Sequence, residues 1–185
     1  MTSASATPST AVSSGVRGSV AGLAVEHFGD DGRFPNSRLP LLVYRSALTP
    51  ARCSPEALEA LFDNCGWPPA WRSTIFTYHH YHSTAHETLG VAAGRARLML
   101  GGPEGRVFEV QAGDVIAIPA GVVHRRLESS GDFLVVGCYP PGQDWDLLRG
   151  EAGDREIALR NIPSVPLPAT DPVTGDATPL TGLWR

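Results

Sequence analysis

The sequence predicts an all-β domain of the antiparallel sandwich or barrel class. Between residues 71 and 139, short strand-like segments follow one another at regular spacing, and turns rich in Gly and Pro separate them. The whole chain contains 20 Gly and 16 Pro among 185 residues, and 42% of its residues are hydrophobic. Such a composition is typical of short strands joined by tight turns around a buried core. The length fits one domain of ordinary size plus a tail.

The elements before this region are two strands and one helix. Residues 23–28 and 39–44 are predicted to be strands, and Pro40 lies near the start of the second, where a missing N–H is tolerated. Residues 54–65 are predicted to form a helix, because Ser54 is a good N-cap and Pro55 suits the first helical position. Apolar side chains then recur at helical spacing, so the helix is expected to pack on the outside of the sheets.

Seven strands are predicted in the central region. Their ranges are 73–82, 86–92, 95–100, 106–110, 114–118, 122–128 and 132–139.

The two ends of the chain differ in character. Residues 1–22 are rich in Ser, Thr and Ala and are expected to form a flexible N-terminal tail, so the single domain would comprise residues 23–185. A short helix is expected somewhere in 144–161. Residues 162–185 are Pro-rich but too apolar for a solvated tail, which predicts an extended arm laid across the domain or across a neighbouring subunit.

Charge and cysteine content exclude several function classes. The formal net charge of −4 gives no electrostatic basis for nucleic-acid binding. All fifteen basic residues are Arg, which excludes Schiff-base chemistry on a lysine and a P-loop lysine. The three cysteines have no C-x-x-C spacing and are expected to be free thiols, as in a reducing cytosol. No apolar stretch is long enough for a membrane span, so the protein is expected to be soluble and cytoplasmic.

Histidines cluster in one short segment. Four of the six lie within residues 79–86, and Glu87 follows them directly. Since side chains alternate along a strand, His80 and His82 would point to one face and could share a metal ion. Glu87 could add a carboxylate from the next strand, and His124 could complete the site after a tight Pro-x-Gly turn. Three imidazoles and one carboxylate suit Mn, Fe, Ni, Co or Zn as a divalent ion.

These residues also fall into two recognisable motifs. His80-Tyr-His82-x4-Glu87-x6-Gly94 resembles the first cupin motif, and Gly113-x5-Pro119-x-Gly121-x2-His124 resembles the second. The surrounding segment 76–90 is similar to the YjlB-type cupins, and the similarity extends from about residue 24 to the C-terminus. The resemblance implies a double-stranded β-helix, or jelly-roll barrel, whose metal-binding core is about residues 71–139. It also implies one divalent metal ion, with His80, His82, Glu87 and His124 as ligands.

The second motif departs from the family at one position. Cupins usually carry Asn four residues after the motif histidine, where this chain has Glu128. If strand alternation continues from His124, Arg126 and Glu128 would also face the cavity, as an anion anchor and a general base. Alternatively, both would lie in solvent at the mouth of the barrel. His86 is expected to turn outward unless the chain shifts at the preceding break, in which case it could become a ligand.

The resulting functional hypothesis is a metal-dependent cupin enzyme of the oxygenase or isomerase type that acts on a small oxygenated metabolite. A non-catalytic module that binds a small molecule or senses metal is the alternative, and metal-independent isomerisation with a histidine as base is a third possibility. No nucleic acid or membrane partner is expected. A homodimer is expected, because one outward face of the predicted sheet would be half apolar and a second subunit could bury it. The residues of outward parity on this face are Ile75, Thr77, His79 and Tyr81.

Overall fold

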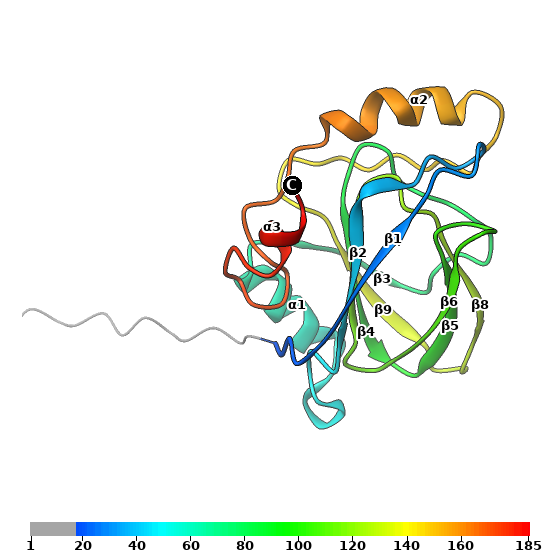
Figure 1. Ribbon diagram of the computed structural model, residues 1–185. Helices are drawn as coiled ribbons and strands as arrows, with labels where there is room; N and C mark the ends of the chain where they lie inside the picture. Colours follow the sequence, from blue (N-terminus) through cyan, green and yellow to red (C-terminus); the bar gives the residue numbers. More distant parts are fainter. Residues whose placement is uncertain (1–17) are drawn as a thin grey trace, which may run out of the picture.

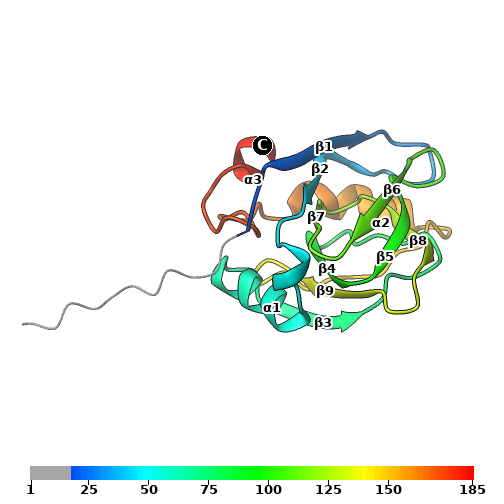
Figure 2. The same cartoon turned by 90° about the horizontal axis from the view of Figure 1, so that it is seen from below.

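Two antiparallel sheets face each other and enclose the core of the molecule (Figures 1 and 2). The structure is a computed structural model that describes residues 18–185, apart from the side chain of Arg52. Within that range, six strands form one sheet in the order β1-β2-β7-β4-β9-β3, and three form the other in the order β6-β5-β8. The strands are β1 (Gly22–Phe28), β2 (Ser37–Arg45), β3 (Pro69–Ser73), β4 (Glu87–Ala93), β5 (Arg95–Leu100), β6 (Arg106–Gln111), β7 (Val115–Ile118), β8 (His124–Ser129) and β9 (Leu134–Cys138).

Strand alternation gives the six-stranded sheet two buried faces. On β2, Leu41 and Val43 pack between the two sheets, whereas Leu42 and Tyr44 pack on the outer face. The interior cluster joins both sheets, because it also contains side chains of β4, β5, β6 and β7. A sheet that is buried on both faces has near-continuous apolar strands, which is what β2 and β7 display.

The outer face of this sheet is covered by α1 (Pro55–Asn64) and by the C-terminal segment (Figure 1). The predicted helix cap is confirmed, since Ser54 Oγ accepts a hydrogen bond from the backbone N–H of Ala57 at 3.1 Å. Leu58 and Phe62 approach Gly90 of β4 so closely that a Cβ there would lie 2.8 Å from each side chain. The helix therefore packs directly on the strand that begins at Glu87.

The helix α2 (Asp154–Asn161) lies across one end of the two sheets, at the top of Figure 1. It contributes Ala158 to a small buried cluster with Phe34, Tyr81 and Val123. Tyr81 is thus fully buried by the same chain, and Ile75 is also buried. The two apolar side chains of the face that was expected to need a partner subunit are thus covered internally, whereas Thr77 is exposed, so this face gives no support to a dimer and the homodimer stays a prediction.

Most strand predictions match the observed strands within one or two residues, but the range 73–82 is wrong. β3 ends at Ser73, which pairs with Val135 of β9 in the six-stranded sheet. His80 instead forms an isolated bridge with His124, at the start of β8 in the other sheet. The chain changes sheets between these two points, so a single ladder cannot run through the segment. The jelly-roll topology stays a prediction beyond this two-sheet description.

The chain ends are described in part. The expected N-terminal tail lies outside the described residues up to position 17, and after it Gly18 and Ser19 donate backbone hydrogen bonds to Val173 and Ala47. The C-terminal segment 162–185 includes two short helices, η2 (Ile162–Ser164) and α3 (Leu180–Leu183), and buries Trp184 against the core. The remaining short helix is η1 (Pro50–Arg52). No helix among residues 18–185 has the length and apolar character that a bilayer crossing requires.

Candidate metal centre

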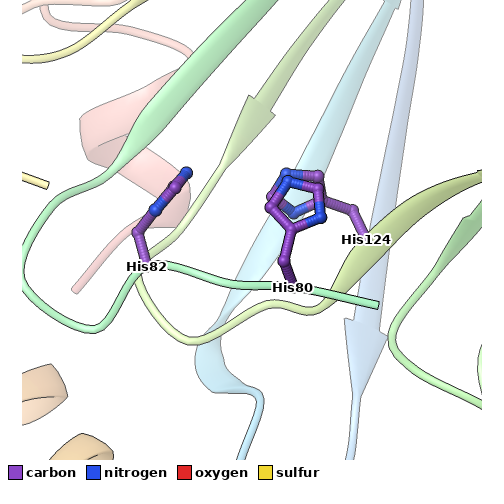
Figure 3. Close-up of side chains that lie close together, drawn as sticks. All are labelled: His80, His82 and His124. Carbon is purple, nitrogen blue, oxygen red and sulfur yellow. The ribbon is translucent and has the colours of Figure 1, made fainter. Parts of the chain in front are cut away.

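Three buried histidines converge at one end of the space between the sheets (Figure 3). His80 and His124 lie opposite each other in an antiparallel bridge, with backbone N to O distances of 3.2 and 2.9 Å between them. Their rings are therefore neighbours, with centroids 4.1 Å apart. His82 lies two residues beyond His80, so its side chain returns to the same side. One nitrogen of each of the three rings lies within 4.8 Å of the others.

Each imidazole is oriented by a backbone carbonyl oxygen next to its Nδ1 atom. The pairs are His80 with Tyr78 at 3.1 Å, His124 with Val122 at 3.2 Å, and His82 with Asp146. A carbonyl oxygen can only accept, so each Nδ1 donates a proton, and in the neutral form each ring presents the lone pair of Nε2. An outer hydrogen bond of this kind fixes the tautomer and ring orientation of metal-binding histidines.

Glu87 places a carboxylate beside the three rings from the first residue of β4. Its Oε2 atom lies 3.3 Å from Nε2 of His124 and 3.5 Å from Nε2 of His82. Its Oε1 atom accepts a hydrogen bond from the Tyr139 hydroxyl at 2.8 Å. Oε2 is buried without a hydrogen-bond partner. An unpartnered buried carboxylate oxygen facing imidazole lone pairs fits a divalent cation, which would bind all of these atoms at once.

The protonation states suit the same role. Burial would raise the pKa of Glu87, but His82 and His124 outweigh it and hold that pKa below its usual range. Burial and the neighbouring His124 lower the pKa of His80 to about 2. Burial also disfavours the charged form of His82, yet the Glu87 carboxylate raises its pKa. At neutral pH the centre therefore holds an ionised carboxylate and, at His80, a neutral imidazole ready to bind a metal.

The four side chains form part of the wall of a cavity of about 270 Å³, here called the histidine cavity. Most of its remaining wall is apolar or aromatic. Besides the three histidines and Glu87, it is lined by Trp71, Ser73, Thr74, Ile75, Phe76, Leu89, Tyr139 and Trp145. Leu89 follows Glu87 at the same parity on β4 and faces this interior. A small molecule in the cavity would contact the metal donors directly.

The loop after β9 supports the centre in a way that sequence spacing did not indicate. Besides the Asp146 carbonyl at His82, the Asp146 carboxylate accepts hydrogen bonds from the backbone N–H and the hydroxyl of Ser83. The Thr84 hydroxyl donates a hydrogen bond to the Asp144 carbonyl oxygen in the same loop, at 2.7 Å. Because about sixty positions separate the two segments, no local pattern could have revealed this contact.

A second supporting contact joins Trp71, Tyr139 and Glu87. The indole N–H of Trp71 donates to the Tyr139 hydroxyl oxygen at 3.1 Å, and that hydroxyl donates to Glu87. Burial and the Glu87 charge raise the pKa of Tyr139, so its hydroxyl stays protonated and remains a donor. Both aromatic residues fall in segments that resemble YjlB-type cupins, but their pairing with a metal-binding carboxylate was not predicted.

The structure places the two predicted catalytic side chains away from the metal donors. Glu128 is exposed and pairs with Arg97 at 2.7 Å. The ladder between β5 and β8 shifts register between Arg126 and Glu128, and such a bulge reverses the alternation that the prediction assumed. Arg126 keeps the parity of His124, but its guanidinium binds the Ile75 carbonyl and the Ser129 hydroxyl. Neither side chain lines the histidine cavity. Their catalytic role stays a prediction that this placement does not favour.

The other singled-out residues lie outside the cluster. His86 is buried, but its Nδ1 accepts the backbone N–H of Ala120 at 3.0 Å and its ring packs near Trp184, so it does not join the three histidines. His79 is half-buried beside Phe34, with ring centroids 5.8 Å apart. Cys138 is buried in the core, and no disulfide joins the cysteines of the described residues.

Comparison with known proteins places these features in a family context. Residues 69–136 match the cupin domain family. The chain is 41% identical over 158 residues to the uncharacterized protein YjlB of Bacillus subtilis, and the match covers 85% of this chain and 93% of that protein.

Solved structures give weaker likenesses. A mutant form of the Bacillus subtilis oxalate decarboxylase has a TM-score of 0.37 at 18% identity, covering 63% of this chain but only 29% of that chain. An acireductone dioxygenase from Bacillus anthracis, with a cadmium ion in its active center, has a TM-score of 0.33 at 18% identity, covering 63% of this chain and 58% of that chain. These scores are too low for either enzyme's activity to be carried over to this chain.

Proposed function

This chain belongs to the cupin-domain proteins of the YjlB type, and on that premise we propose that it is a metal-dependent enzyme of the oxygenase or isomerase type. Its substrate would be a small oxygenated metabolite bound in the histidine cavity. The observation that carries the proposal is the unpartnered Oε2 atom of Glu87, buried beside the Nε2 atoms of His82 and His124.

The donors of the proposed centre are His80, His82, His124 and Glu87. When bound there, a divalent metal would supply Lewis-acid polarisation, or a site where dioxygen and substrate meet. The identity of the ion is left open among Mn, Fe, Ni, Co and Zn, because all accept imidazole and carboxylate ligands.

The remaining residues of the cavity would bind and shield the substrate. Trp71, Ile75 and Leu89 form apolar walls that limit the access of water to the donor atoms. The Tyr139 hydroxyl holds its proton toward Oε1 of Glu87, which leaves Oε2 as the oxygen that faces the histidines.

Elemental analysis of protein purified without an affinity tag tests the proposal. We expect about one divalent ion per chain in the natural protein and almost none in His82→Ala, because one of the three converging nitrogens is lost. His27→Ala is the matched control, since His27 is exposed on β1 and lies outside the cluster. Absence of stoichiometric metal from the natural protein, or an unchanged metal content in His82→Ala, would contradict the proposal.

A non-catalytic module that binds a small molecule or senses metal is the second candidate. It is favoured by the scarcity of proton-transfer groups, since the described residues of the cavity wall offer only Ser73, Thr74 and Tyr139 beyond the donors. Oxygen uptake and product analysis with the Fe(II)-loaded protein, over a panel of catechols, diketones and thiols, separate the two candidates. Stoichiometric binding without turnover of any panel member would favour the module.

A further inference from the structure

The wall of the histidine cavity carries very little charge. Of the described residues that line it, Glu87 is the only acidic one and none is an arginine. The guanidinium of Arg126, on the strand that begins at His124, is bound to the Ile75 carbonyl and the Ser129 hydroxyl. An anionic substrate in the cavity therefore has no arginine on the wall to compensate its charge, and the histidines there are the proposed metal ligands.

The charge of the centre itself limits what can bind beside it. Neutral imidazoles contribute no charge, so a divalent ion bound by them and by the Glu87 carboxylate would form a centre with a net charge of about +1. One negative charge on a ligand neutralises this centre. A second negative charge would be removed from water into an apolar wall without a partner, which is costly.

Two half-exposed aromatic rings lie beside the histidines at the open side of the cavity. Phe76 has 48% of its surface exposed and lies 5.1 Å from the His80 ring, between centroids. Trp145 is 49% exposed and lies 5.5 Å from the His82 ring. Trp145 also stacks on Tyr139 with 17° between the ring planes and 5.8 Å between centroids. These surfaces can receive the face of a flat ring, which aromatic side chains bind well.

From these features we propose that the cavity selects a flat, largely apolar molecule that carries at most one negative charge, and that it discriminates against small dicarboxylates. Two adjacent oxygen atoms of this molecule would fill the positions that four protein ligands leave open on a six-coordinate ion. Trp145 is the residue that contacts the ring of this ligand at the entrance. The volume of about 270 Å³ accommodates on the order of ten non-hydrogen atoms, at roughly 30 Å³ for each water-sized group. This inference rests on the proposed metal centre and names its substrate class.

The test compares two probes that differ only in charge. 3,4-Dihydroxybenzamide and 3,4-dihydroxybenzoate have the same chelating oxygens and nearly the same shape, but only the second carries a carboxylate. When the catechol loses one proton on binding the metal, the bound amide has a charge of −1 and the bound benzoate a charge of −2. Titration calorimetry with the metal-containing protein should show the amide binding at least about tenfold more tightly than the benzoate, and oxalate binding more weakly than the amide. Equal or tighter binding of the benzoate or oxalate, or no binding of the amide, would overturn the inference.

A second measurement tests the role of Trp145. Trp145→Ala should weaken the binding of 3,4-dihydroxybenzamide about tenfold, because the ring contact is lost. It should leave unchanged the affinity for acetohydroxamate, a chelator without a ring. Leu147→Ala is the matched control, since Leu147 is an exposed apolar residue of the same loop and does not line the cavity. An unchanged affinity of Trp145→Ala for the amide, or an equal loss for acetohydroxamate, would contradict the assignment.

Metal analysis of the same samples separates the two kinds of failure. Protein without metal would contradict the proposed function. Protein with one ion per chain that binds the dianionic probes as well as the amide would contradict only the substrate class.

Discussion

At the scale of single residues, the geometry of the centre depends on groups that orient the donors. His82 is the clearest case, because its Nδ1 faces the Asp146 carbonyl and the next residue, Ser83, is bound by the Asp146 carboxylate. The Asp146 carboxylate thus holds the backbone at Ser83, next to His82, close to the Asp146 carbonyl that orients the His82 ring. Outer hydrogen-bond partners of this kind typically change metal affinity by a factor of about 10 to 100.

Asp146→Ala should therefore weaken metal binding about tenfold or more without abolishing it, since all four donors remain. Competition with a coloured chelator measures the affinity. Asp144→Ala removes the same charge from an exposed position in the same loop and should leave the affinity unchanged. Equal effects of the two substitutions would show that charge alone, and no specific contact, is responsible.

Tyr139→Phe tests the partner of Glu87. The substitution leaves Oε1 of Glu87 without its donor and the Trp71 indole N–H without its acceptor. We expect a loss of about 1–3 kcal/mol in the free energy of unfolding of the metal-free protein, together with weaker metal retention. Chemical denaturation and metal analysis measure the two effects.

Tyr81→Phe is the matched control for this substitution. The Tyr81 hydroxyl is also buried, but it has no hydrogen-bond partner, so its removal should cost little. A similar loss of stability in both variants would contradict the role assigned to Tyr139.

At the scale of elements, one irregularity in a strand decides which side chains face the site. β8 carries His124 inward at its first residue, and Arg126 keeps that parity. The register shift before Glu128 then turns this residue toward Arg97 on the outer surface. Because the side-chain period of a strand is two, a shift of one residue exchanges the two faces.

The helix α1 contributes to stability from the far side of the six-stranded sheet. Leu61 is fully buried in the outer cluster, whereas the histidine cavity lies on the inner side of that sheet. Leu61→Ala should therefore lower the free energy of unfolding by about 2–5 kcal/mol, the usual cost of such a cavity, while the metal content stays at one ion per chain. Asp63→Ala, at an exposed position of the same helix, is the control. Loss of metal from folded Leu61→Ala protein would show that helix and centre are coupled.

At the scale of the whole molecule, the C-terminal segment is held to the outer face by a buried polar contact. Asp171 accepts hydrogen bonds from the Tyr44 hydroxyl at 2.5 Å and from the backbone N–H groups of Val173 and Leu180. Burial and the Asp171 charge raise the pKa of Tyr44 well above its usual value. Burial also raises the pKa of Tyr81 to about 12.

These shifts predict a loss of stability in alkali. Unfolded tyrosines lose their protons near pH 10, whereas the folded protein retains them, so the free energy of unfolding should fall as the pH rises above about 10. The loss at pH 11 should be about 1 kcal/mol for each of Tyr44 and Tyr81. Every basic side chain is Arg and stays charged in this range, so lysine titration does not mask the effect.

Urea denaturation of the metal-free protein at pH 9 and pH 11 measures this loss. Tyr44→Phe cannot ionise at that position and should lose about 1 kcal/mol less than the natural protein between the two pH values. An identical pH dependence in both proteins would exclude Tyr44 as a source of the alkaline loss.

How far the sequence predicts the molecule depends on the range of the interactions involved. The helix at 55–64 and strands such as β2, β5 and β9 follow from local patterns, since caps, apolar spacing and turn residues act within a few positions. The strand predicted over 73–82 failed because its two ends pair with different sheets, which alternation along one segment cannot reveal.

In the candidate site, too, the features set by local sequence could be predicted, whereas those set by contacts between distant segments could not. The sequence alone determined the local donor pattern, because His80 and His82 share a face whenever the chain between them is extended, and Glu87 begins the next strand. Only the tertiary structure decided that His124 pairs with His80, that the Asp146 carbonyl orients His82, and that Glu128 points away. The physical reason is that hydrogen bonds between distant segments, and a bulge set by the partner strand, depend on packing, which is not encoded in any short stretch of residues.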